Sequence, residues 1–168
     1  TITDLTPDKL VDALVDGSLD AIITFNPHIS DAQSRLGSNV RVWSLQGDQK
    51  LSPLLYTNST LTTSNPEAIR RYLSALIEAE NFIQTNNDDA RGVVGSYLKF
   101  DDTYMHAVWS NITFDVSLDQ DLLISMDDEA RWAIENKITP ATAAPDFLQF
   151  MYFGGLEAVK PEGITVIR

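Results

Sequence analysis

Residues 21–28 read Ala-Ile-Ile-Thr-Phe-Asn-Pro-His, an apolar run followed at once by residues that start helices. The run at 21–25 is rich in β-branched and aromatic residues, which predicts a buried strand. Asn26 predicts the N-cap of a helix and Pro27 its first residue, because asparagine caps helices well and proline suits the first turn. We expect this helix to reach about residue 36. The stretch therefore predicts a strand that leads directly into a helix.

Similar signals on either side extend this pattern into an α/β layer. Thr6 predicts an N-cap in front of Pro7, and Gly17 predicts the end of that first helix. Residues 41–45 predict another strand. Short strand and helix units in alternation are typical of α/β folds. We therefore expect residues 1–46 to form an α/β portion.

The character of the sequence changes after residue 46. Residues 47–50 are a polar turn, and residues 54–61 read as an extended run. From residue 65 onward, apolar residues recur every three or four positions, which predicts helices. Ser64 and Glu67 predict a capping box at the start of the first of them. Further helices are expected at 88–98, 101–109, 119–135 and 145–159, with a last strand at 164–167.

The composition excludes several classes of function. Twenty-four acidic against twelve basic residues give a net charge of -12, which repels nucleic acid and anionic lipid, so we expect neither as a partner. Without cysteine, no disulfide, thiolate nucleophile or cysteine-based metal site can form. His28 and His106 have no nucleophile motif beside them. The sequence predicts a protein that is not an enzyme, with no catalytic residues, metal or cofactor.

Three separated stretches carry a family resemblance. The first joins Gly-Ser-Leu-Asp-Ala at 17–21 to Phe-Asn-Pro-His at 25–28. The second is Asn-Pro-Glu-Ala-Ile-Arg-Arg-Tyr-Leu-Ser-Ala at 65–75, and the third joins Gly-Leu-Glu-Ala-Val-Lys-Pro at 155–161 to Ile-Thr-Val at 164–166. In this order and spacing they resemble the nitrate, sulfonate and taurine class of periplasmic substrate-binding proteins, which also includes binders of thiamine pyrimidine precursors.

The resemblance implies an α/β fold of two lobes, the type II periplasmic-binding-protein fold, with its N-terminal portion missing from this chain. Residues 1–46 would then be the remainder of lobe two, and residues 47–64 the return hinge crossing. Residues 65–168 would be a mainly helical segment that packs on lobe one. Such a fold closes on its ligand by hinge motion.

The same resemblance implies the solute-binding component of an ABC importer. It would capture a small polar or anionic organic molecule, similar to a sulfonate, nitrate or a pyrimidine, in a cleft between the lobes. The class further implies a monomer in the periplasm or another extracytoplasmic place, where it meets a membrane permease. A lipid anchor on the missing N-terminal part is compatible with this.

The expected binding site combines the strand-to-helix junction with the hinge. Ligands of open α/β layers bind at the carboxyl ends of strands, beside helix starts. The junction lacks the family's acidic residue, because Asn26 stands where the family has glutamate; this favours an anionic or neutral solute. The plainer alternative is that Asn26 only caps a helix and that the hinge residues are ordinary strand positions. The candidate ligand-binding residues are Phe25, Asn26, Pro27, His28, Tyr56, Thr57 and Asn58.

Three other readings of the sequence stay open. The chain could be an extracytoplasmic ligand-sensing domain of a membrane receptor, which an adjacent transmembrane segment would identify. A pyrimidine-synthase-like enzyme is the weaker reading, because that type carries a cysteine-rich signature. A structural or interaction module is the third. In each case, Trp43, Trp109 and Trp132 are expected in the core, because tryptophan buries a large apolar area.

Overall fold

The computed structural model of the chain describes residues 2–45 and 52–168, which belong to two compact units, Thr1–Leu51 and Ser52–Arg168. Helix makes up 59% of the chain and strand 1%, and the described residues form no sheet. The expectation of an α/β fold with two lobes is therefore wrong. The predicted turn at 47–50 lies outside the described residues, and the division at 46 and 64 stays a prediction.

The β-prone runs fail to form strands because a strand depends on its neighbours. Its backbone hydrogen bonds go to another strand, so propensity alone does not create one. Within the described residues, no ladder forms at 21–25 or 41–45. The expected strand at 164–167 is reduced to a single parallel bridge between Leu118 and Ile164. The run at 54–61 also turns helical in its last part.

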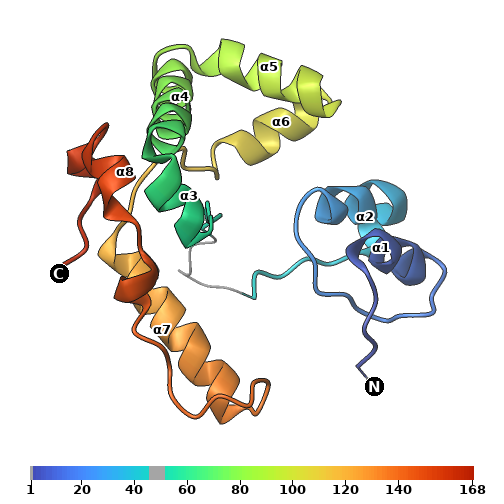
Figure 1. The fold of residues 1–168 in the computed structure, drawn as a ribbon. Helices are drawn as coiled ribbons and strands as arrows, with labels where there is room; N and C mark the ends of the chain where they lie inside the picture. Colours follow the sequence, from blue (N-terminus) through green and yellow to red (C-terminus); the bar gives the residue numbers. More distant parts are fainter. Residues whose placement is uncertain (1, 46–51) are drawn as a thin grey trace. The chain divides into compact units, whose positions relative to one another are not determined.

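The first unit is a pair of short helices that lie side by side (Figure 1). They are α1, Pro7–Val15, and α2, His28–Leu36, and the 3-10 turn η1, Gly37–Asn39, follows α2 directly. An ion pair joins them, with 2.7 Å between Arg35 Nη1 and Asp12 Oδ1. One small apolar residue of each helix is buried, Val11 in α1 and Ala32 in α2.

The two helix starts of this unit differ in how well the sequence predicted them. Thr6 is the N-cap of α1, and Gly17 lies just beyond its end with a φ of 79°, so both assignments are confirmed. Asn26 does not cap α2, because its Oδ1 atom instead accepts a hydrogen bond from the Ser30 hydroxyl at 3.2 Å. The helix itself begins one residue later than expected, at His28.

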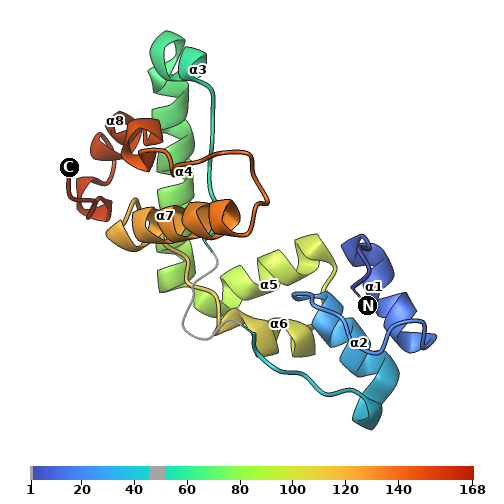
Figure 2. The same ribbon diagram turned by 90° about the horizontal axis from the view of Figure 1, so that it is seen from below.

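The second unit is built around a helix of 20 residues, α4 (Figures 1 and 2). Helices α3 and α5 contact α4 at its start and its end, α8 packs against it, and α6 packs on α5. No helix within 2–45 and 52–168 is long and apolar enough to cross a membrane. The elements are α3 Ser59–Ser64, α4 Pro66–Thr85, α5 Asn87–Leu98, α6 Asp102–Trp109, α7 Gln120–Glu135, η2 Phe147–Phe150, α8 Phe153–Glu157 and η3 Pro161–Gly163.

The predicted capping box of α4 is wrong, although the helix itself is confirmed. Asn65 rather than Ser64 caps it, since its Oδ1 accepts a hydrogen bond from the Ala68 amide at 3.2 Å. The Glu67 carboxylate instead forms ion pairs with Arg70 and Arg71, one turn further along the helix. Arg71 Nε lies 3.0 Å from Glu67 Oε1. Asparagine is as good an N-cap as serine, so two adjacent candidates compete for one position.

The expected helix at 145–159 is broken into η2 and α8. The break lies at Met151 and Tyr152, whose backbones are extended, and Gly154 and Gly155 follow inside the short α8. Gly155 has a packing role there. A Cβ atom added to it would lie 3.0 Å from Leu73 Cδ1 and 3.1 Å from Ile69 Cγ2 of α4. The glycine therefore lets the two helices approach closely.

We expect opposite effects from the same substitution at two glycines. Gly155→Ala should destabilise the second unit by about 1–3 kcal/mol, because the added methyl group overpacks the contact with α4. Gly92→Ala in α5 should stabilise it by about 0.5–1 kcal/mol, because nothing lies within 4 Å of the added atom. Urea unfolding followed by circular dichroism measures both. Equal effects of the two changes would contradict the close packing of α8 on α4.

The main core lies between α5 and α6. Ala90, Met105 and Trp109 are buried in it, and partly buried apolar residues from the neighbouring segments surround them. The prediction of a core tryptophan is confirmed for Trp109. It is wrong for Trp43 and Trp132, whose side chains are exposed.

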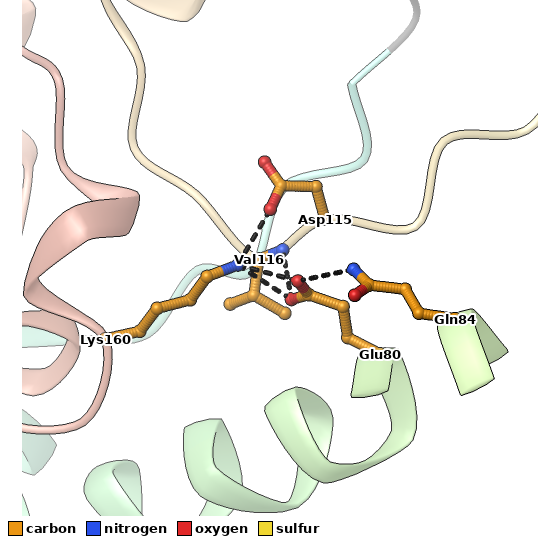
Figure 3. Close-up of polar contacts among 5 residues, drawn as sticks. All are labelled: Glu80, Gln84, Asp115, Val116 and Lys160. Carbon is orange, nitrogen blue, oxygen red and sulfur yellow. Dashed lines mark hydrogen bonds and ion pairs between the residues drawn. The ribbon is translucent and has the colours of Figure 1, made fainter. Parts of the chain in front are cut away.

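The second unit also contains a buried ionic cluster (Figure 3). Glu80 of α4 is only 7% exposed, and its Oε1 and Oε2 atoms lie 2.8 and 2.9 Å from Lys160 Nζ. The backbone N–H of Val116 donates to Glu80 Oε2 at 3.0 Å, and Gln84 Nε2 donates to Oε1 at 3.2 Å. Asp115 Oδ1 is a second carboxylate partner of Lys160 at 2.8 Å. Two carboxyl groups, of Glu80 and Asp115, thus share one lysine.

The cluster shifts two pKa values. Burial by itself lowers the pKa of Lys160, but its hydrogen bonds to Asp115 and Glu80 outweigh burial, so that the pKa is raised. The hydrogen bond from Lys160 lowers the pKa of the Asp115 carboxyl. Both shifts favour the charged forms. The charged pair of Lys160 and Asp115 is thus stabilised by the contact between them.

Replacing the lysine tests what this cluster contributes. Lys160→Met should destabilise the second unit by about 3 kcal/mol, because it leaves the buried Glu80 carboxylate without its cation. Lys137→Met is the matched control, since Lys137 is exposed and its loss should change the stability by under about 0.5 kcal/mol. Urea unfolding measures both variants. If Lys160→Met were as stable as the control, the ionic cluster would not contribute to the stability of the second unit.

The chain as a whole leaves much of its surface open to solvent. Its accessible area is 12690 Å², whereas two separate folded bodies of these sizes would together expose about 9800 Å². The large exposed apolar side chains include Ile23, Trp43 and Leu45 of the first unit. The chain therefore buries a smaller share of its surface than self-contained domains do.

Candidate functional site

The predicted junction residues lie at the start of α2. Phe25 and His28 contact each other edge to face, with 5.6 Å between their ring centroids. The strand on which the junction argument depended is absent from the described residues, so the rule about strand ends does not apply here. The role of Phe25, Asn26, Pro27 and His28 in ligand binding stays a prediction.

The predicted hinge residues lie in the other unit. Asn58 is the N-cap of α3, because its Oδ1 accepts a hydrogen bond from the Leu61 amide at 2.9 Å. Tyr56 is 90% exposed, and Thr57 is exposed beside it. Asn58 therefore has a structural use, while a ligand-binding role for the three residues stays a prediction.

One hollow of the second unit lies where α5 begins and α6 ends. It has a volume of about 440 Å³ and is open to solvent. Trp109 and Phe114 form part of its lining, with their ring centroids 4.7 Å apart. Its polar residues come from the first five residues of α5 and from the end of α6. The lining residues are Asn87, Arg91, His106, Trp109, Ser110, Ile112 and Phe114.

Local capping explains why these residues meet. Asp101 caps α6, accepting the Tyr104 N–H at 2.9 Å, and only a short connection separates α6 from the end of α5. The two helices therefore pack against each other. The segment after α6 forms the remaining wall. Val116, two residues beyond Phe114, is held by Glu80 of the ionic cluster, which fixes the direction of this segment.

The polar groups of the hollow include several hydrogen-bond donors. Trp109 Nε1 donates to Asn87 Oδ1 at 3.1 Å. An indole N–H can only donate, so the oxygen of the Asn87 side chain faces it and the amide nitrogen is directed elsewhere. Arg91 adds a guanidinium, and its side chain is 18% exposed. None of the seven lining residues is acidic.

Asn87 is also the first residue of α5, a helix of 12 residues. The start of a helix carries a partial positive charge from its unpaired N–H groups. This field adds to the charge of Arg91 at the hollow. One carboxylate moderates it, since Asp88 Oδ1 lies 2.9 Å from Arg91 Nη1 and is 85% exposed.

A second hollow of about 310 Å³ lies along α4. Glu67 and Glu78 line it together with Arg70 and Arg71, so carboxylates and guanidinium groups are mixed. Both arginines are already hydrogen-bonded to Glu67. Its charges are largely satisfied within the chain, which makes it a weaker candidate for binding a charged molecule.

Metal binding finds no site in the described part of the chain. No group of three or more His, Asp or Glu residues within 2–45 and 52–168 is placed to hold an ion. The two carboxylates of the ionic cluster, Glu80 and Asp115, both bind Lys160. None of these three residues lines either hollow.

The sequence did not single out the hollow at α5 and α6. It predicted both helices and assigned Trp109 to the core, which is where the structure places it. The missed signal is the pair of cationic or protonatable residues on consecutive helices, Arg91 and His106. Because only a short connection joins these helices, they must be neighbours, but sequence periodicity does not say which faces meet.

Comparisons with known proteins find no match to the chain. No protein-family model matches the chain, and no curated protein and no solved structure matches it. The resemblance of the stretches at 17–28, 65–75 and 155–166 to a family of substrate-binding proteins therefore stays a prediction.

Proposed function

We propose that the chain captures a small organic anion as the solute-binding component of an importer. The observation that carries the proposal is the acid-free, donor-rich lining of the hollow at α5 and α6. An anion is favoured by donors and positive charge, and both meet there. The proposal does not include a cleft between two α/β lobes.

The lining of the hollow differs in charge from the chain as a whole. None of the seven residues that line the hollow is acidic, although the chain has twice as many acidic as basic residues. A local positive potential in an acidic protein concentrates anions at that place. Arg91 supplies the permanent charge. Asn87 and Ser110 add neutral donors suited to the oxygens of a sulfonate or carboxylate.

The apolar part of the lining favours an organic anion over an inorganic one. Phe114 and Ile112 provide apolar surface, since Phe114 is partly exposed and Ile112 about half exposed; Trp109, only 6% exposed, packs against Phe114. A solute with a short alkyl chain or a ring could cover this surface while its anionic group meets Arg91. Small-molecule sites commonly combine an apolar lining with a few placed polar groups.

The importer role is supported by the sequence. The three stretches that resemble substrate-binding proteins occur in the family's order along the chain. The second of them forms the first half of α4, in keeping with the helix that the resemblance implies there. Genes for a permease and an ATPase beside this one would favour the importer over a receptor's sensing domain.

Replacing the arginine of the hollow tests the proposal. The wild-type protein should bind benzenesulfonate in isothermal titration calorimetry. Arg91→Met keeps the apolar stem but removes the charged donors, and we expect it to weaken binding about tenfold or more, since hydrogen bonds to charged groups contribute about 1.5–3 kcal/mol.

The matched control is Arg70→Met in the second hollow. Arg70 pairs with an acidic residue three positions earlier, as Arg91 does, so the same kind of ion pair is lost. Its affinity for benzenesulfonate should equal that of the wild type. Binding that survives Arg91→Met, or a wild type that binds no organic anion, would contradict the proposed site.

A further inference from the structure

The exposed carboxylate of Asp88 forms an ion pair with the arginine of the hollow. It contacts the one permanent cation of the lining, with 2.9 Å between Asp88 Oδ1 and Arg91 Nη1. Asp88 itself does not line the hollow. The structure therefore holds an anionic group of its own against the arginine that an incoming anion would need.

The two partners of this ion pair differ in their surroundings. Arg91 is 18% exposed, so its position is largely fixed by packing, whereas Asp88 is 85% exposed. An exposed ion pair is weak, because water and salt screen it and a mobile side chain loses freedom in forming it. The carboxylate is thus held loosely on a rigid cation. It can move aside at little cost when a stronger anion arrives.

We propose that Asp88 sets the charge preference of the hollow by competing for Arg91. It partly neutralises the guanidinium, which lowers the affinity for every anion and excludes anions that bind arginine weakly. A neutral solute of the same shape is not opposed in this way. The inference rests on the proposed function, since it assigns a specificity-determining residue to that site.

Asp88→Asn removes the competing charge while keeping nearly the same shape. The affinity for benzenesulfonate should rise about two- to fivefold, the range expected from losing one exposed ion pair. The affinity for benzenesulfonamide, a neutral analogue, should not change. Isothermal titration calorimetry at neutral pH and fixed salt measures both ligands, and the melting temperature of the variant checks its fold.

Asp89→Asn is the control, because Asp89 lies in the same first turn of α5 and its loss changes the net charge equally. It should leave the affinity for benzenesulfonate as in the wild type. Equal gains in the Asp88 and Asp89 variants, or no gain in either, would overturn the competition while leaving solute capture intact. Absence of benzenesulfonate binding in the wild type and in both variants would overturn the inference together with the proposed function.

Discussion

The buried carboxylate of Glu80 is the group on which the second unit depends. A charge with so little exposure must be matched by partners, because leaving it unpaired away from water costs several kcal/mol. Its partners, the Val116 amide and the Lys160 ammonium, lie 36 and 80 residues further along the chain. The hydrogen bonds of Glu80 therefore bring the segments around Val116 and Lys160 to the same place on α4. The bridge between Leu118 and Ile164 forms beside it.

The same constraint extends to the candidate site. Val116 follows Phe114 closely, so anchoring its backbone on Glu80 also directs the segment that forms one wall of the hollow. Trp109 belongs both to the core between α5 and α6 and to the lining of the hollow. The donors at the start of α5 then face an apolar surface that the fold holds in position. The proposed anion site would therefore be held in place by contacts that also stabilise the second unit.

Local signals predicted the helices well and the strands poorly. Asp101 and Asp119 each cap a helix where an acidic residue precedes an apolar pattern, and such signals act over three residues. The runs at 21–25 and 41–45 needed a partner strand that their own residues cannot specify, so their β-prone composition misled the fold prediction. The hollow was missed for a related reason. Its residues come from three segments, α5, α6 and the segment after α6, and the last of these is anchored by Glu80, which lies far from it in sequence.

Hydrogen exchange of backbone amides, followed by NMR on the whole chain, tests the role of the Glu80 cluster most directly. The amides of Val116, Leu118 and Thr165 donate to Glu80, Gly163 and Leu118 outside any helix. If the cluster closes the second unit, these three amides exchange slowly and at rates similar to that of Met105 in the core. Exchange at the rates of an unfolded chain, with Met105 still protected, would contradict the claim that Glu80 organises this unit.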